Sequence, residues 1–294
     1  MKSIKTPTEG AYQFELGETR CTVIVDGSFV YPHPAALFFA TAPEGKRNEA
    51  LRRYGIDPGE WPEVTLPYHC LLVEHEAGTV LVDTGAGDIA PTTGNLPYRL
   101  ADLGLEPADI DVVVVSHAHP DHIGGLVTEG DPTFPTATHY IPAREYEYWH
   151  PEPDLTGLEL PTEFLDLMAS TAAANLEPVA TANGWREVTG EQAVHPAVTV
   201  VPAPGHTPGH AAVSVTSAGE ELLHLVDTVI HPLHIEWIRW AAGFDHHPNR
   251  VADTRRKLLE MAAEADLSMV THFPEPGLGR VAETDEGFTW QPIR

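Results

Sequence analysis

The apolar residues of the chain fall into short runs typical of strands, with longer stretches of helical spacing between them. The runs rich in β-forming residues predict strands at 20–26, 68–74, 79–83, 112–115, 196–202, 210–216, 221–226 and 267–271. Ala77-Gly78 predicts a hairpin between the second and third of these strands. The four consecutive valines at 112–115 present no polar face, which is typical of a strand covered on both sides.

Leucine and alanine at helical spacing predict the main helices. We expect helices at 96–103, 142–149, 161–176 and 250–264. Two β-rich halves, about 20–140 and 185–272, therefore flank a helical middle. This order favours a layered α/β fold in which two sheets pack together with helices outside. Without a repeat or a long linker in the sequence, we expect one domain over residues 1–294.

Composition and the start of the chain bear on location. Hydrophobic residues make up 42% of the 294 residues, which is enough to bury a core. No apolar run approaches the roughly 20 residues that span a bilayer. The segment Met1–Pro7 lacks the apolar stretch of a secretory signal. We therefore expect a cytoplasmic protein that does not insert into a membrane.

The charge balance is strongly acidic. Forty-three acidic and 17 basic residues give a formal net charge of −26. Since nucleic-acid binding needs clustered lysine and arginine, a nucleic-acid partner is not expected. The acidic residues are spread along the chain, which indicates a solvated surface and leaves a salt-rich habitat open. Cys21 and Cys70 lie in strand-like runs, so buried thiols are favoured over a disulfide.

The most informative segment is Ser116-His117-Ala118-His119-Pro120-Asp121-His122-Ile123-Gly124-Gly125, directly after the valine run. In an extended chain alternate side chains share a face, so His117, His119 and Asp121 are expected to point the same way. His122 breaks this alternation, and the two glycines permit a tight turn. Imidazole and carboxylate groups suit zinc, manganese, iron or cobalt. The segment therefore predicts a metal site, the alternative being an ordinary polar loop.

This segment resembles the His-x-His-x-Asp-His signature of the metallo-β-lactamase superfamily. Four further motifs of the chain resemble that family in the expected order, namely Asp83-Thr84-Gly85, Gly205-His206-Thr207-Pro208-Gly209-His210, Asp227 and Thr271-His272-Phe273-Pro274. The resemblance covers about residues 20 to 290 and implies an αββα sandwich, with two central mixed β-sheets and helices on the outer faces.

The resemblance also implies a pair of divalent metal ions. One ion would be bound by His117, His119 and His206, the other by Asp121, His122 and His272, and Asp227 would bridge the two. Zinc is the expected ion, with manganese, cobalt or iron as alternatives. Catalytic metal sites keep one position open for water, which this ligand count allows.

Two residues near these motifs have alternative interpretations. Asp83 either accepts a hydrogen bond that orients a metal ligand or is a turn residue after a strand. His210 is expected to be a hydrogen-bonded structural histidine and not a further ligand.

Other histidines follow the bridging aspartate. His246 and His247 precede Pro248 in what resembles a helix start, which favours capping over substrate contact. The roles of His231 and His234 stay open.

Aromatic residues suggest a substrate pocket and an interface. The candidate pocket residues are Phe38, Trp149, Ile230, Trp237, Trp240 and Phe244. These would form an apolar wall beside the metals, the alternative being core residues. The proline-rich stretch 31–45 is expected to be a loop that serves as a lid or as a contact of a homodimer.

Within the superfamily the chain is most similar to the methyl parathion hydrolase and quorum-quenching lactonase group. The segments 80–87, 119–125 and 272–279 carry this similarity. His119 argues against flavodiiron oxygen reductases, which have glutamate there. RNA-cleaving members have a large extra domain and a basic surface. Sulfur dioxygenases and glyoxalase II enzymes share the first motif and stay alternatives, although they do not resemble the N-terminal 60 residues or the end of this chain. Ile230 is a departure, because several lactonases place a tyrosine three residues beyond the bridging aspartate.

The resemblance implies a hydrolase acting on a small substrate with an apolar part. A hydroxide bridging the metals would open a lactone or cleave a carboxylic ester, with Asp121 or Asp227 as the catalytic proton carrier. The sequence contains no Gly-x-Ser-x-Gly elbow, so a serine nucleophile is not indicated. Organophosphate triester hydrolysis is the alternative activity, and a non-catalytic metal-binding protein is the alternative outside enzymes.

Overall fold

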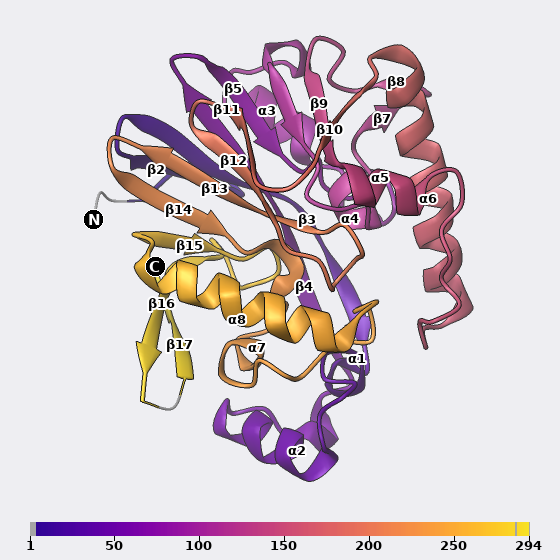
Figure 1. Ribbon diagram of the computed structural model, residues 1–294, viewed down its shortest axis with the longest axis vertical. Coiled ribbons are helices and arrows are strands. Elements are labelled where there is room, and N and C mark those ends of the chain that lie inside the picture. Colours follow the sequence, from indigo (N-terminus) through magenta and orange to yellow (C-terminus); the bar gives the residue numbers. More distant parts are fainter. Residues whose placement is uncertain (1–3, 286, 294) are drawn as a thin grey trace.

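Two β-sheets packed face to face form the centre of the molecule in the computed structural model, which describes residues 4–285 and 287–293 (Figure 1). The first sheet contains, in spatial order, β1 (Lys5–Thr8), β2 (Ala11–Leu16), β3 (Thr19–Pro32), β4 (Glu63–His75), β5 (Gly78–Val82), β6 (Val112–Val114), β9 (Thr138–Pro142) and β10 (Trp185–Val188). The second contains β11 (Gln192–His195), β12 (Val198–Pro202), β13 (Ala211–Ser217), β14 (Glu220–His224), β15 (Leu267–Met269), β16 (Leu278–Thr284) and β17 (Gly287–Pro292). A small ribbon joins β7 (Val127–Thr128) to β8 (Asp131–Pro132).

Alternation of side chains along each strand divides the apolar residues between inner and outer layers. In β4, Leu71 and Val73 enter the core between the two sheets, whereas Cys70 and Leu72 enter the core on the helix side of the first sheet. β14 does the same in the second sheet, with Leu222 facing inward and Leu223 outward. Because successive side chains of a strand point to opposite faces, the continuous apolar runs produce a sheet buried on both sides.

Helices cover both outer faces, which completes the expected αββα sandwich. On the side of the first sheet lie α1 (Pro34–Phe38), α2 (Glu44–Arg53), α3 (Leu96–Asp102), α5 (Ala143–Trp149) and α6 (Thr162–Ala182). On the side of the second lie α7 (Leu233–Glu236) and α8 (Pro248–Glu264), the latter running across the sheet in Figure 1. The remaining helical segments are α4 (Pro120–Ile123) and the 3₁₀ turns η1 (Pro58–Glu60), η2 (Pro107–Asp109) and η3 (Val226–Thr228).

The expected elements all have counterparts in the structure. The predicted strands correspond to β3, β4, β5, β6, β12, β13, β14 and β15, and the predicted helices to α3, α5, α6 and α8. The hairpin across Ala77-Gly78 is confirmed by the pairing of His75 with Gly78. The strands that the apolar pattern missed are β1, β2, β7, β8, β9, β10, β11, β16 and β17, most of them short or lying at a sheet edge.

The stretch 31–45 differs from the loop that was expected. It contains the end of β3, all of α1 and the start of α2. Phe38 and Phe39 are buried within the chain at 1% and 0% exposure, so they do not form an exposed aromatic contact. Pro34 at the first helical position explains the difference, because its fixed φ angle suits the start of a helix.

The two cysteines are buried and free, as expected. Cys21 faces the core between the sheets and Cys70 the helix side of the first sheet, so their side chains lie on opposite faces. Among the described residues, no helix has the length and the apolar character needed to cross a bilayer.

Shortening a side chain between the two sheets should destabilise the protein strongly. Leu71 is 0% exposed, and Leu71→Ala should lower the free energy of unfolding by about 2–5 kcal/mol, since the cavity left behind cannot collapse fully. The control is Val30→Ala on β3, because Val30 is 47% exposed and its truncation should cost less than about 0.5 kcal/mol. Chemical denaturation of both variants in the same metal state measures the difference, and equal midpoints would contradict the assignment of this core.

Candidate metal centre

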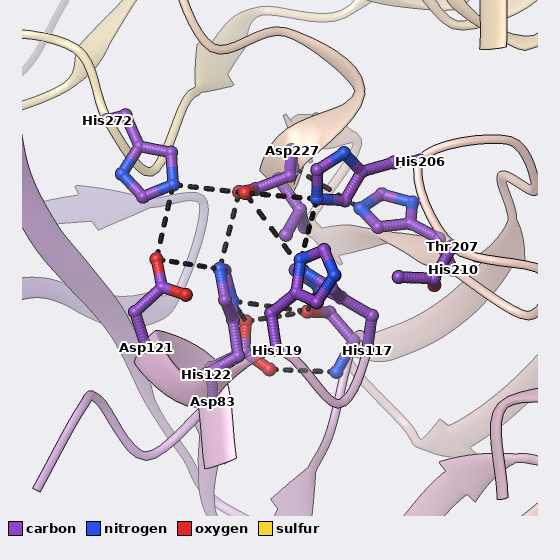
Figure 2. A network of polar contacts seen from close by, with 12 residues as sticks. Asp83, His117, His119, Asp121, His122, His206, Thr207, His210, Asp227 and His272 are labelled. Carbon is purple, nitrogen blue, oxygen red and sulfur yellow. Dashed lines mark hydrogen bonds and ion pairs between the residues drawn. The ribbon is translucent and has the colours of Figure 1, made fainter. Parts of the chain in front are cut away.

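The first four candidate ligands come from the segment that follows β6. His117 and His119 lie on extended chain, and His119 is the residue before the first turn of α4. Asp121 and His122 lie on that turn. The strand-like alternation expected to include Asp121 is therefore wrong beyond His119, because Pro120 at the first helical position starts a helix. The helix turn directs Asp121 and His122 to one side of the cluster and leaves the two earlier histidines on the other (Figure 2).

The other three candidates come from loops of the second sheet. His206 lies in the loop between β12 and β13, Asp227 in η3 after β14, and His272 directly after β15. β14 and β15 are parallel neighbours, so Asp227 and His272 emerge at the same edge of the sheet. This shared edge brings together residues that are far apart in the sequence.

Two glycines allow the segment after β6 to approach the loop after β5. A Cβ atom on Gly124 would lie 2.1 Å from the carbonyl oxygen of Ala86, and one on Gly125 would lie 2.2 Å from that of Thr84. These distances are far below van der Waals contact, so only glycine fits. The close approach places Asp83 beside His122.

Asp227 lies at the centre of the cluster, where Figure 2 shows the imidazole rings converging. Its Oδ2 atom is 3.0 Å from His272 Nε2, 3.5 Å from His206 Nε2 and 4.0 Å from His117 Nε2. Its Oδ1 atom is 3.3 Å from His122 Nε2. The two oxygens of this carboxylate therefore face different sets of histidines.

The donor atoms form two groups, each with its atoms within 4.8 Å of one another. One group is His117, His119 and His206, and the other is Asp121, His122, Asp227 and His272. The structure thus brings together all seven residues named from the sequence. Six of them divide as the resemblance implied, and Asp227, which was expected between the groups, falls in the second one.

The chemistry of the cluster fits two cations. His117 Nε2, His122 Nε2 and Asp227 Oδ1 are buried and make no hydrogen bond with the described residues. The Nδ1 atom of His119 and the Nε2 atom of His206 are only 2.9 Å apart. Buried polar atoms without partners are costly, and divalent cations bound by imidazole and carboxylate groups would satisfy them.

Oxygen atoms outside the cluster orient three of the histidines. Asp83 Oδ2 is 2.7 Å from His122 Nδ1, and Asp245 Oδ1 is 2.8 Å from His206 Nδ1. The carbonyl oxygen of Pro67 is 3.2 Å from Nδ1 of His272. Each contact accepts the proton of Nδ1 and leaves the lone pair of Nε2 directed into the cluster, as is typical of metal-binding histidines.

Two of these contacts are made by aspartates, and only Asp83 was considered for such a role from the sequence. Asp83 holds the orienting position considered for it, and its Oδ1 atom also accepts the backbone N–H of Ser116 at 2.8 Å. Asp245 lies just before the expected helix start, and α8 does begin at Pro248 with His247 as its N-cap. No spacing in the sequence relates Asp245 to His206, so only the folded chain reveals their contact.

His210 holds the backbone of the central aspartate. Its Nδ1 atom lies 3.1 Å from the carbonyl oxygen of Ala203, and its Nε2 atom accepts the N–H of Asp227 at 3.3 Å. Both nitrogens of His210 are thus used in hydrogen bonds. This arrangement is that of a hydrogen-bonded structural histidine and not of a further ligand.

The remaining histidines lie outside the two groups of donor atoms. His246 stacks on His119 with ring centres 6.0 Å apart. His234 Nε2 lies 2.8 Å from the carbonyl oxygen of Phe38, and His231 packs its ring against Phe39 at 5.2 Å. His231 and His234 therefore stabilise the packing of the segment after Asp227 against the α1 region.

A buried glutamate that the sequence analysis missed joins the two ligand loops. The side chain of Glu145, on α5, accepts hydrogen bonds from the backbone N–H of Ala118 at 2.9 Å and of Gly209 at 2.8 Å. It also accepts from the Thr207 hydroxyl and the Trp149 indole, each at 2.7 Å. Four donors satisfy this fully buried carboxylate, which fixes the segments that carry His117, His119 and His206 relative to each other.

Burial determines the direction of the pKa shift in one pair of histidines, and the charge of Asp227 determines it in the other. Burial lowers the pKa of His117 and His119 well below the ordinary value, so both are neutral and ready to bind a cation. Burial also disfavours the charged forms of His122 and His272, but the nearby Asp227 carboxylate outweighs it and raises their pKa. These two histidines in turn hold the pKa of Asp227 well below its usual value, despite its burial.

A mostly apolar pocket opens beside the cluster. Its lining includes three of the pocket residues expected from the sequence, Phe38, Ile230 and Phe244. The lining residues that the sequence analysis did not name are Phe29, Tyr31, Leu66, Tyr68, Ile89, Phe164, Leu167 and Met168. The last three have helical spacing on α6, and Phe29 and Tyr31 alternate on β3, so the sequence carried a signal for them.

The three tryptophans expected to line this pocket do not line it. Trp149 is buried behind the cluster, with its ring 5.5 Å from that of His119. Trp237 and Trp240 stack on each other at 4.6 Å and border a separate hollow beside Phe288. Their closeness to Asp227 in sequence was misleading, because α7 carries the chain away from the cluster.

Comparison with known proteins agrees with this fold and site. A family model described as the metallo-beta-lactamase superfamily matches residues 64–271. The chain belongs to the metallo-beta-lactamase superfamily. The matched region includes six of the seven candidate ligands, and the last, His272, is the next residue after it.

Relatives in this superfamily include proteins named as lactonases. The chain is 27% identical over 231 residues to an N-acyl homoserine lactonase of a Bacillus species, covering 71% of this chain and 82% of that protein. It is 29% identical over 248 residues to a probable metallo-hydrolase of Mycobacterium tuberculosis, covering 72% and 76%.

Two solved structures share the whole fold. The hydrolase AbOPH of the beta lactamase superfamily is 25% identical, with a TM-score of 0.84 and 98% of each chain covered. AidC, described as a dizinc quorum-quenching lactonase, is 24% identical, with a TM-score of 0.83 and coverage of 97% of this chain and 98% of that one. The fold therefore extends beyond the region that the family model matches.

Removing the charge of Asp245 should weaken cation binding by the group that contains His206. Asp245→Asn replaces the charged acceptor that orients the His206 ring by a neutral amide, which is a weaker acceptor, and we expect about a 10- to 100-fold loss of affinity for one of two zinc equivalents. Competition with a coloured chelator measures both affinities. Asp253→Asn, at an exposed position of α8, is the matched control. Unchanged affinity in Asp245→Asn would show that this contact does not position the ring.

The two groups should differ in the pH dependence of cation binding. His122 and His272 have raised pKa values, so in metal-free protein they hold protons that a cation must displace. His117 and His119 have lowered values and hold none at neutral pH. One equivalent should therefore bind more weakly as the pH falls through neutrality, with proton release, while the other changes little. Calorimetry in two buffers of different ionisation enthalpy measures the released protons, and equal release for both equivalents would contradict this assignment.

Proposed function

We propose that this protein is a metal-dependent hydrolase that opens lactones or cleaves carboxylic esters of small molecules with an apolar part. The observation that carries the proposal is the two-group cluster at one end of an apolar pocket, with five of its members lining that pocket, namely His119, Asp121, His206, Asp227 and His272. An apolar pocket with a few polar groups gathered at one end suits a small molecule. The relatives named as N-acyl homoserine lactonases support a lactone as the first substrate class to test.

The seven cluster residues would hold two divalent ions, with zinc as the first choice. Such a pair of cations would lower the pKa of a water molecule and polarise the oxygen of the acyl group under attack. Asp227 would use both oxygens to hold the two sites together, because they face different histidines. The other residues of each group would fix the position of its cation.

Of the two carboxylates considered for proton transfer, we assign the role to Asp121. Its side chain is 12% exposed and borders the pocket, whereas that of Asp227 is 5% exposed and surrounded by histidines. A carboxylate at the pocket surface can accept a proton from the attacking water and return it to the leaving oxygen. Asp121 also lies 3.4 Å from His272 Nε2, which fixes its position in the second group.

Other proposals from the sequence remain to be tested along with this one. Organophosphate triester hydrolysis would use the same cluster, so a triester belongs in the substrate panel. A non-catalytic metal-binding protein is less well supported, because the cluster borders an apolar pocket. A homodimer, a cytoplasmic location and one domain over the whole chain stay predictions from the sequence.

The function is tested with zinc-loaded protein and a panel of an alkyl lactone, an aryl ester and a phosphotriester. We expect the lactone or the ester to be hydrolysed fastest and chelation to abolish turnover. Asp121→Asn should lower kcat by about 10²- to 10⁴-fold, since it removes the proton acceptor. Asp253→Asn again serves as the exposed control.

Single-turnover hydrolysis in oxygen-18 water separates direct attack by water from attack by a carboxylate of the enzyme. With enzyme in excess, direct attack by water puts the label into the product acid in the first turnover. An unlabelled acid would indicate that an enzyme carboxylate attacked the acyl carbon and passed its own oxygen to the product, and this would contradict the proposed mechanism. No turnover of any substrate by protein that holds two zinc equivalents would contradict the proposed function itself.

A further inference from the structure

Polar side-chain atoms are rare on the wall of the pocket. Apart from the cluster residues, only two of the described lining residues have a polar side-chain atom, Tyr31 and Tyr68. The others are phenylalanine, leucine, isoleucine, methionine or proline. Ile230, three residues beyond Asp227, is apolar and provides no donor. The two phenol hydroxyls are therefore the only side-chain O–H groups among the described residues that line this pocket.

The two tyrosines form a fixed pair on adjacent strands. Tyr31 lies on β3 and Tyr68 on β4, and their hydroxyl oxygens are 2.7 Å apart. The Tyr31 ring packs edge-on against Phe38 at 5.6 Å and Phe244 at 6.0 Å. The Tyr68 ring packs edge-on against the imidazole of His272 at 5.6 Å, so the pair lies beside the cluster.

One of the two hydroxyl protons is not used in the hydrogen bond between the tyrosines. Two hydroxyls that hydrogen-bond to each other use one proton between them, and the second proton needs another acceptor. Neither hydroxyl has a further hydrogen-bond partner among the described residues, although Tyr31 is 8% exposed and Tyr68 only 2%. Burial raises the pKa of both phenols well above the ordinary value, so both protons are retained. A buried O–H donor is left available at the pocket wall.

We propose that this tyrosine pair donates a hydrogen bond to the substrate oxygen on which negative charge develops during hydrolysis. The inference rests on the proposed function, since the reacting carbon must lie beside the cluster. The pair lies there too, through the contact of Tyr68 with His272. A preorganised donor in a mostly apolar pocket stabilises such charge far more than it would in solution.

The donor acts without losing its proton. The oxygen of water bonds to the acyl carbon, and the proton that it releases goes to Asp121. The electron pair of the carbonyl bond moves onto the acyl oxygen, which accepts the hydrogen bond from the tyrosine pair. When that electron pair returns, the bond to the ester oxygen breaks, and this oxygen takes the proton back from Asp121.

This placement also narrows the substrate class. The rest of the wall, with Phe29, Phe164, Leu167 and Met168, provides only apolar contacts. A substrate that fits therefore has a carbonyl at the cluster and an aliphatic or aromatic substituent along the wall. No lysine or arginine lines the pocket among the described residues, so a substituent with a carboxylate would find no cationic partner there.

The test removes the hydroxyls and keeps the rings. Tyr31→Phe, Tyr68→Phe and the double variant are compared with wild type in the zinc-loaded state, after metal content is measured. Tyr98→Phe is the matched control, because Tyr98 is 73% exposed and lies outside the pocket lining. We expect the double variant to lose on the order of 10²-fold in kcat, with KM little changed and two zinc equivalents retained. A single variant with the full loss identifies the donating tyrosine.

A binding measurement tests the donor without relying on turnover. Hexylphosphonate carries negative oxygens at a tetrahedral centre and an apolar tail, and calorimetry gives its affinity for zinc-loaded protein. The double variant should bind it at least about 10-fold more weakly than wild type. Its binding to wild type should also change the tyrosine absorption near 290 nm, and this change should vanish in the double variant.

Several results would overturn the tyrosine assignment. These are wild-type kcat and phosphonate affinity in the double variant, a loss that appears only in KM, or a loss that follows the metal content. Failure of the proposed function looks different, because zinc-loaded wild type would then hydrolyse nothing in the panel. In that case the phosphonate affinities still decide whether the tyrosine pair donates to an anionic oxygen.

Discussion

Asp227 imposes the main constraint on this structure, because a nearly fully buried carboxylate must be compensated by positive charge or hydrogen bonds. Its two oxygens lie within 4.0 Å of the Nε2 atoms of four histidines that come from three segments of the chain. Cations would satisfy both the carboxylate and the buried imidazole nitrogens that lack partners. In the metal-free chain the carboxylate raises the pKa of His122 and His272 against the effect of their burial, so protons on these rings partly replace the cations.

The scaffold around this cluster is itself held by buried polar contacts. Asp83 and Asp245 each fix one histidine ring, and His210 holds the backbone of Asp227. Glu145 joins the two loops that carry the first group of histidines. Each carboxylate is satisfied by several donors or by an imidazole, so the cluster does not depend on flexible surface contacts.

Apolar packing accounts for the shape of the pocket. Strands β3 and β4 and helix α6 contribute rings and aliphatic side chains to one wall, while the ligand loops form the other end. The same aromatic cluster that buries Phe38 also holds Tyr31. A wall built in this way is apolar and leaves a pair of hydroxyls as its polar feature.

The amino-acid sequence by itself determined the sandwich fold and the seven candidate ligands. Continuous apolar runs identify strands buried on both faces, and the histidines and aspartates directly follow such runs. Local patterns of this kind depend on neighbours a few residues apart, so the sequence displays them. For the same reason β1, β2 and the edge strands were missed, since pairing with a distant strand and not local pattern makes them strands.

Only the tertiary structure decided how these residues are supported and what surrounds them. Asp245 meets His206 across 39 residues, and Glu145 meets Gly209 across 64. Trp237 lies ten residues from Asp227 in the chain and yet outside the pocket, whereas Tyr31 and Tyr68 lie far from it in sequence and line it. Contacts of this kind depend on the packing of whole sheets and helices, and such packing leaves no spacing in the sequence by which to find them.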